Sequence, residues 1–234
     1  LDGDTNNTKP VADPEILPKA NYMGGDLAGV LEKIKDGYFE ELGINTVWLS
    51  PITQNPEGAY GLWPEPRTKF SGYHGYWPIS NTKIDYRFGD EQLLKEIIEE
   101  AHKRNLNIAF NPAPMTESVK KLPLNKLTLL VVNEVEAKQL TGESAVEAIK
   151  VALKASYPTT KILLTLGKAG VWFVEGDVEE FCAAFKVEAI DTTAAGDTFI
   201  GFFLAAYQSN MAIAEALKYA CAASALAVMK TGAG

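Results

Sequence analysis

A strand, a turn of very small residues and a helix follow one another in the C-terminal part of the chain. Phe185–Ile190 has the apolar composition of a strand, and Asp197–Tyr207, rich in Phe, Leu and Ala, has that of a helix. The turn before the helix consists of residues with almost no side chain, Ala194, Ala195 and Gly196. Their backbone N–H groups can face a ligand at a helix N-terminus, where the helix dipole favours negative charge.

Asp197 lies directly beside this turn. A carboxylate repels phosphate, so it is an odd choice for simple anion binding. It is well suited to act as a base that removes a proton from a hydroxyl attacking the phosphate. The alternative is a helix-capping Asp after a glycine turn, and the spacing alone leaves both interpretations open.

The run D-T-T-A-A-G-D-T-F at residues 191–199 resembles the signature of the ribokinase (PfkB) family of sugar kinases. The resemblance implies that Asp197 is the catalytic base and that the amides of the A-A-G turn form an anion hole. It covers the chain from about Asn111 to Gly234, and it implies ATP with Mg²⁺ as cofactor and a sugar as partner.

The same resemblance implies further site residues in the C-terminal half. Asn133 and Glu136 would lie near the metal and the phosphates, although they also suit a helix cap. Gly167 and Gly170 resemble the nucleotide-binding loop, although two glycines after a strand usually form a tight turn. Asp191 and Thr193 match positions that help to hold a monovalent cation, a site that in relatives also uses residues beyond the equivalent of this C-terminus. The helix predicted for Ala212–Met229 would pack beside the adenine pocket.

The remaining elements of this half are predicted from hydrophobic periodicity and turn residues. A capping box at Ser144 and Glu147 opens a helix that reaches Ser156, and Gly176-Asp177 is a hairpin turn. The expected strands are Leu127–Val132, Lys161–Thr165, Val171–Val174 and Val178–Phe181.

Three motifs in the first ninety residues resemble the α-amylase family of glycoside hydrolases (family 13), near the start of its eight-stranded barrel. They are G-G-D-L-A-G-V-L, G-I-N-T-V-W-L-S-P-I and Y-H-G-Y-W-P-I-S-N-T-K-I-D-Y-R-F-G. The resemblance implies a structural Ca²⁺ site, for which a solvated polar loop is the alternative. Its ligands would be Asp2, Asp4, Asn6, Asn7, the carbonyl of Gly24, and Asp26. It also implies that Tyr73 and His74 line a sugar subsite, with aromatic packing as the favoured alternative.

Glycosidase chemistry needs two carboxylates that flank the scissile bond, and in this family they follow later barrel strands. No counterpart follows here, because the chain continues with Asn111-Pro-Ala-Pro, which resembles the kinase family. The periodicity gives a helix from Asp26 to Leu42, a strand at Ile44–Leu49, a helix at Asp90–Lys103 and a strand at Leu106–Phe110. Two strands cannot close a barrel, so we expect no glycosidase activity.

These observations predict one α/β domain over residues 1–234, a three-layer sandwich with a mostly parallel central sheet. Residues 1–107 would be an α-amylase-like fragment, and residues 108–234 the C-terminal half of a ribokinase-like protein. The strands at 44–49 and 106–110 would pair into the kinase sheet. We interpret the chain as a recombinant chimera without a complete active site that keeps an ATP or phosphate site. A weak sugar kinase and a carbohydrate-binding fragment are the alternatives.

The composition and net charge of the chain limit the classes of partner that it can bind. A net charge of −8 argues against nucleic acid or an anionic membrane as the main partner. No apolar run is long enough to span a bilayer and no signal peptide precedes Leu1, so we expect a cytoplasmic protein if it is expressed as is. The abrupt ends suggest a fragment, and an exposed sheet edge would favour self-association. Cys182 and Cys221 lie among apolar neighbours and are expected to be buried free thiols.

Overall fold

The computed structural model describes residues 3, 9–61 and 68–232. The chain forms two compact units. Unit 1 comprises Leu1–Leu106 with Lys121–Pro123, and unit 2 comprises Asn107–Lys120 with Leu124–Gly234. This division falls next to the predicted join at residues 107–108, whereas a single domain over residues 1–234 stays a prediction.

Unit 1 consists mainly of helices and irregular segments around a small core. Leu27 and Leu31 of α1 pack with Ile97 of α3 in that core. The two helices predicted to begin at Asp26 and Asp90 are α1 and α3, and each is capped by that Asp side chain. The elements are η1 (Pro18–Ala20), α1 (Leu27–Lys35), α2 (Tyr38–Glu41), β1 (Thr53–Gln54), β2 (Ser80–Ile84) and α3 (Glu91–Lys103).

Two predictions for unit 1 are wrong. The helix expected from Asp26 to Leu42 is broken at Gly37, whose φ of 80° lies in the left-handed region. Ile44–Leu49 forms no strand, although all six residues lie in the described part of the chain. Its apolar side chains are exposed, Trp48 to 70%. An apolar run becomes a strand only if a neighbour takes up its backbone hydrogen bonds, and the two-stranded sheet of unit 1 pairs β1 with β2.

Unit 2 has the predicted three-layer α/β architecture. Its sheet has the order β3-β4-β5-β6-β7, in which β6 alone runs opposite to the others. The sheet is therefore mixed and mostly parallel, as predicted. The elements are β3 (Ala109–Phe110), α4 (Glu117–Lys120), η2 (Leu124–Lys126), β4 (Leu129–Asn133), α5 (Glu134–Thr141), α6 (Val146–Ser156), β5 (Lys161–Thr165), η3 (Gly167–Ala169), β6 (Gly170–Glu175), β7 (Val178–Ala183), α7 (Ala195–Gln208) and α8 (Ile213–Ala227).

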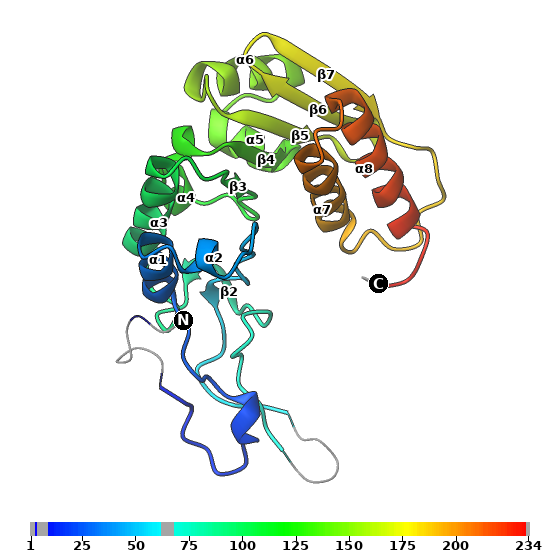
Figure 1. Cartoon of the computed structure of the whole chain (residues 1–234). Helices are drawn as coiled ribbons and strands as arrows, with labels where there is room; N and C mark the ends of the chain where they lie inside the picture. The colour runs from blue at the N-terminus through cyan, green and yellow to red at the C-terminus, as the bar shows by residue number, and fades with distance from the viewer. Residues whose placement is uncertain (1–2, 4–8, 62–67, 233–234) are drawn as a thin grey trace. The chain divides into compact units, whose positions relative to one another are not determined.

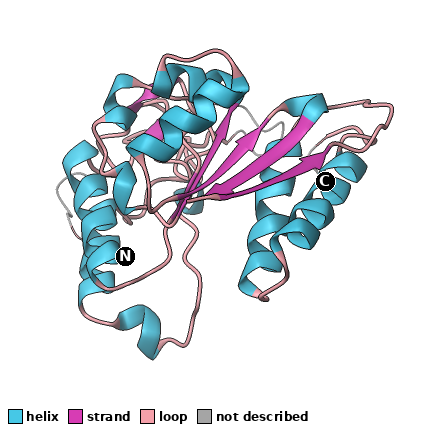
Figure 2. Ribbon diagram, turned by 90° about the horizontal axis from the view of Figure 1, so that it is seen from above, coloured by secondary structure: helices cyan, strands magenta, loops and turns pink. Residues whose placement is uncertain are grey.

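Alternating side chains of the sheet build two cores. Leu129, Leu163 and Phe173 face α7 and α8, where they meet Phe203 and Leu217, all buried. The alternate residues of the same strands face α5 and α6 on the other side, because successive strand residues point to opposite faces. Figures 1 and 2 show these helix pairs on the two faces of the sheet.

The strands and helices of unit 2 follow the predictions closely, with three corrections. Only Ala109–Phe110 of the predicted Leu106–Phe110 forms a strand, and it pairs with β4. Phe185–Ile190 forms no strand, although it is fully described. Its apolar run lies between β7 and α7, and Ile190 N donates instead to the carbonyl of Val228 at 2.8 Å. Ser144 caps no helix, since α6 begins after Ala145 without a side-chain cap.

Candidate functional site

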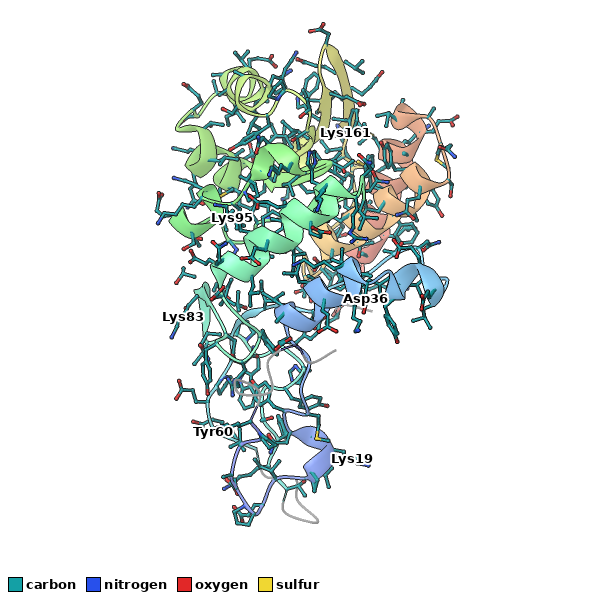
Figure 3. All side chains as sticks on the ribbon, turned by 60° about the vertical axis from the view of Figure 1, so that its left-hand side comes forward. Lys19, Asp36, Tyr60, Lys83, Lys95 and Lys161 are labelled. Atoms are coloured by element: carbon teal, nitrogen blue, oxygen red, sulfur yellow. The ribbon has the colours of Figure 1, made fainter. Side chains whose placement is uncertain are left out.

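The candidate residues of unit 2 gather at one edge of the sheet. The parallel strands β4 and β5 end side by side, with Asn133 opposite Thr165. Helix α7 runs antiparallel to β5. The ring centroid of Tyr207, near the C-terminus of α7, lies 5.9 Å from the Nζ of Lys161. Lys161, labelled in Figure 3, is the first residue of β5. The N-terminus of α7 therefore lies toward the carboxyl ends of the parallel strands, where open α/β sheets bind ligands.

The start of α7 has the open backbone that the small-residue turn predicts. Ala194 has φ 60° and ψ 10°, a left-handed conformation that is unusual for a residue with a Cβ. Ala195 N donates to the carbonyl of Thr192 at 3.3 Å. Within the described residues, the N–H groups of Gly196 and Asp197 have no hydrogen-bond acceptor, so they can donate hydrogen bonds to a bound anion. Asp197 is exposed in this first turn.

A hollow of about 440 Å³ lies between α7 and α8, next to this turn. Its lining is largely apolar, with Phe202 and Tyr219 in edge-to-face contact at 5.5 Å. Ala194 and Thr198 line it beside the helix N-terminus, and Lys230 is the basic residue among its lining side chains. Phe202 and Tyr219 are not among the predicted site residues, because the sequence shows them only as aromatic residues on two consecutive helices.

Asp191 and Thr193 lie together just before α7. The Oδ1 of Asp191 accepts from the Thr193 hydroxyl at 2.6 Å and from its N–H at 2.9 Å. The other carboxylate oxygen accepts from Gly232 N at 3.0 Å. The Thr193 hydroxyl, followed by the two amides, lowers the pKa of Asp191 to about 2. The structure thus brings the two residues together, and their role in cation binding stays a prediction.

Asn133 and Glu136 form a reciprocal capping box at the start of α5. Asn133 Oδ1 accepts from Glu136 N, and Glu136 Oε2 accepts from Asn133 N, both at 2.9 Å. Burial raises the pKa of the Glu136 carboxyl above its ordinary value. The capping alternative is thus present in the structure, and a role near metal and phosphates stays a prediction.

Gly167 and Gly170 bound a tight turn between β5 and β6. Gly167 has φ 51° with open space around it, and Gly170 has φ 129°. A Cβ at Gly170 would collide with the backbone of Cys182 and Ala183, so this position requires glycine. The tight-turn alternative accounts for both glycines, and their contact with a nucleotide stays a prediction.

In unit 1, Asp26 connects the chain start to α1. Its Oδ1 accepts from Gly29 N at 2.7 Å and from Gly3 N at 2.8 Å. Gly24, whose carbonyl is a predicted ligand, has φ 98°. The other predicted ligands lie outside the described residues: Asp2, Asp4, Asn6 and Asn7. No group of three or more His, Cys, Asp or Glu side chains in the described chain is placed to hold a metal ion. The Ca²⁺ site stays a prediction.

The aromatic side chains of unit 1 form two contacting groups. Tyr73 lies edge-on to His74, with ring centroids 5.2 Å apart, and His74 stacks on Tyr76 at 6.1 Å. Tyr60, labelled in Figure 3, packs on Trp77 at 5.7 Å. This is the packing that the alternative interpretation describes, and the sugar subsite stays a prediction.

Unit 1 contains a buried ion pair that was not predicted from the sequence. Arg87 donates to both carboxylate oxygens of Asp85, at 2.8 and 2.7 Å, and stacks over the ring of Tyr22 at 4.0 Å. Burial alone would raise the pKa of Asp85, but hydrogen bonds from Arg87 and from Asn55 N hold it below its ordinary value. The pair organises the loops around β1 and β2. The available sequence signal was the pair of opposite charges at Asp85 and Arg87, two positions apart in a stretch rich in aromatic residues.

The described residues contain no helix with the length and apolar character needed to cross a bilayer.

Comparisons with known families divide the chain in two. Residues 89–234 match the family described as pfkB family carbohydrate kinase, and residues 2–113 match the alpha amylase catalytic domain. Both families were identified from the sequence motifs, and the predicted change between them at residues 107–108 lies inside the stretch that the two matches share.

Individual relatives repeat this division. A ribokinase of Staphylococcus aureus is 36% identical over 140 residues, covering 58% of this chain and 46% of that protein. A cyclomaltodextrin glucanotransferase of Thermoanaerobacterium thermosulfurigenes is 33% identical over 119 residues, covering 49% of this chain and 16% of that protein. The chain thus spans about half the length of the ribokinases it matches, and less of the amylase-type enzymes.

Solved structures support the fold of unit 2. A putative ribokinase from Agrobacterium tumefaciens aligns with a TM-score of 0.52 at 31% identity, over 62% of this chain and 48% of that one. The Arabidopsis thaliana ribokinase complexed with ribose and ATP aligns with a TM-score of 0.54 at 24% identity, over 63% and 49% of the two chains.

Proposed function

The chain belongs to the pfkB family of carbohydrate kinases, and from that premise we propose that unit 2 binds an adenine nucleotide at the start of α7. The observation that carries the proposal is the hollow between α7 and α8, which adjoins the open backbone of the helix N-terminus. Its volume of about 440 Å³ falls within the roughly 300–1,000 Å³ typical of small-molecule sites.

The two parts of this site suit the two ends of a nucleotide. The apolar wall that Phe202 and Tyr219 form together suits a flat base, and the free N–H groups of Gly196 and Asp197 suit a phosphate. Lys230 adds positive charge at the hollow. Mg²⁺ would neutralise phosphate charge. Asn133 and Glu136, the residues implied near the metal, hydrogen-bond each other's backbone here, so the proposal gives Mg²⁺ no further role.

We further propose that the chain is a recombinant chimera that lacks a complete active site. Kinase relatives supply the acceptor-sugar site from their N-terminal half, as the family resemblance implies, whereas residues 2–113 of this chain match the alpha amylase catalytic domain. Holding the acceptor in line with the phosphate is worth roughly 7–11 kcal/mol of the barrier. Without that alignment, Asp197 has no positioned hydroxyl to deprotonate, and we expect no sugar-kinase or glycosidase turnover.

Isothermal titration calorimetry with ATP and Mg²⁺ tests nucleotide binding. We expect binding heat from the parent protein and its loss in Ala223→Leu, which fills the hollow. The matched control Ala155→Leu, at an exposed position of α6, should bind as the parent does. The double variant Asn133→Ala/Glu136→Ala tests the residues implied near the phosphates. A parent protein that releases no heat, while circular dichroism reports a folded chain, would remove the proposal.

A weak sugar kinase is the second candidate, favoured by the exposure of Asp197 in the first turn of α7. ATP consumption measured with and without ribose separates the two candidates. A ribose-dependent rate that disappears in Asp197→Asn would establish the kinase in place of the inactive chimera.

The aromatic side chains of unit 1 favour a third candidate, a carbohydrate-binding fragment. Tyr73 and Tyr76 are exposed to 42% and 63% of their surface, as sugar-stacking rings are. Quenching of tryptophan fluorescence by maltodextrin, lost when both tyrosines are replaced by alanine, would support this candidate. No quenching in the parent would exclude it.

A further inference from the structure

The two cysteines of the chain come from different elements but face the same core of unit 2. Cys182 on β7 lies directly opposite Val171 of β6. Opposite residues of an antiparallel pair point to the same face of the sheet, and Val171 is buried in the core under α7 and α8. Cys182 therefore faces these helices, and it packs against that core.

Cys221 meets Cys182 from the other side. It lies on α8, one turn after Leu217, and it is 8% exposed within the same core. Burial raises the pKa of Cys221 to about 12, and the neighbouring Cys182 thiol adds to the increase. Cys182 and Cys221 thus belong to one core, in which α8 packs against β7. Both are free in this structure.

Cys182 and Cys221 differ in their exposure to solvent. Cys221 is buried, whereas Cys182 is only half-buried, against the expectation of two buried thiols. The Cys182 sulfur donates a weak hydrogen bond to the carbonyl of Ala183 at 3.6 Å. An oxidant from solvent therefore reaches Cys182 first, and Cys221 lies in the core against which Cys182 packs.

We propose that Cys182 and Cys221 are a modification site at which a peroxide forms a reversible disulfide between β7 and α8. The Cys182 sulfur attacks one oxygen of hydrogen peroxide, the O–O bond breaks, and a sulfenic acid and one water result. The Cys221 sulfur then attacks the sulfenic sulfur, the S–O bond breaks, and a second water leaves. Two thiols are oxidised by two electrons, and the peroxide is reduced to two waters.

A disulfide between Cys182 and Cys221 would also affect the hollow between α7 and α8. Ala222 and Ala223, which follow Cys221 on α8, line that hollow. A disulfide at residue 221 fastens this wall to the sheet through β7. Because a covalent link constrains the unfolded chain, the oxidised protein is also expected to unfold at a higher temperature than the reduced one.

Mass spectrometry of the whole chain before and after hydrogen peroxide tests the site. We expect the loss of about two mass units and of both thiols together, with full reversal by dithiothreitol. Digestion without reductant should yield the Cys182 and Cys221 peptides as one linked species. These measurements use the unaltered chain, so they do not depend on a core variant that fails to fold.

Single variants test the order of the two steps. Cys221→Ser should leave a sulfenic acid on Cys182 that dimedone traps, because the partner thiol is missing. Cys182→Ser should leave Cys221 unreacted at the same peroxide concentration. Two free thiols after treatment, a sulfinic acid on Cys182 beside a free Cys221, or a disulfide that links two copies of the chain would each overturn the proposal.

Discussion

The capping box at the start of α5 allows the structural role of Asn133 to be separated from its implied role in nucleotide binding. Asn133→Ala removes the acceptor for Glu136 N, a bond of 2.9 Å, and leaves that amide without its partner. Replacing such a cap by alanine typically costs about 1 kcal/mol of stability. We therefore expect the free energy of opening of unit 2 to fall by about that amount without any nucleotide present.

Native-state hydrogen exchange measures this loss where it should occur. The amides of β4, whose Leu130 and Val132 are fully buried, report the opening of the sheet that precedes α5. A loss of 1 kcal/mol corresponds to about fivefold faster exchange of the slowest amides. Asn125→Ala, at an exposed position of η2, is the matched control and should leave the exchange rates unchanged.

Glu136→Gln extends the test, because glutamine keeps an acceptor for Asn133 N but carries no charge. Burial raises the pKa of the folded Glu136 above 4.5. The folded state therefore binds the proton more tightly, and stability falls as pH rises through the folded pKa. The glutamine variant should thus be more stable than the parent at neutral pH and equal to it below pH 4.5. Unchanged exchange in Asn133→Ala together with lost ATP binding would refute the capping account.

Three further predictions concern other sites. Ala194→Gly should raise stability in urea unfolding by about 0.5–1 kcal/mol, because relief of the left-handed conformation exceeds the entropic cost of glycine; a destabilised variant would contradict this. Asp191 has a folded pKa of about 2, below its ordinary 3.8, so its contribution is present above pH 3.8 and lost as pH falls toward 2. Asp191→Asn should remove that part of the acid unfolding curve, and an unchanged curve would count against the hydrogen bonds to Thr193. Arg87→Met leaves Asp85 as a buried carboxylate without its ion-pair partner and should cost about 3–5 kcal/mol in urea unfolding of unit 1. An unaffected midpoint would rule out that pair as the organiser of the loops.

Local patterns predicted most of the strands and helices of unit 2 and the turn between two of its strands. Lys161–Thr165 forms β5 as predicted, and the Gly176-Asp177 turn joins β6 to β7. The helices predicted to begin at Asp26 and Asp90 begin one residue later, each capped by that side chain, and such a cap is a local signal. The reciprocal bonds of Asn133 and Glu136 were predictable for the same reason.

Features of the site that depend on contacts between distant residues could not be predicted in this way. The hollow needs Phe202 and Tyr219 from two helices, and the Asp191 carboxylate is engaged by Gly232, 41 positions away. The left-handed conformation of Ala194 also has no local signal, since alanine favours right-handed helix at most positions. The family resemblance identified the turn, but the packing of α8 on α7 determines what adjoins it.

Ile44–Leu49 shows how far an apolar pattern alone can specify a strand. Its composition is as strand-like as that of β5, yet β5 pairs on both edges and Ile44–Leu49 forms no strand. A strand without neighbours leaves its N–H and C=O groups to water and gains no cross-strand packing to offset the entropy of an extended chain. In a barrel, the strands on either side would supply those partners. The conformation of this segment is therefore decided by the strands beside it, and a peptide that paired with its edge should convert it to a strand with a matching rise in hydrogen-exchange protection.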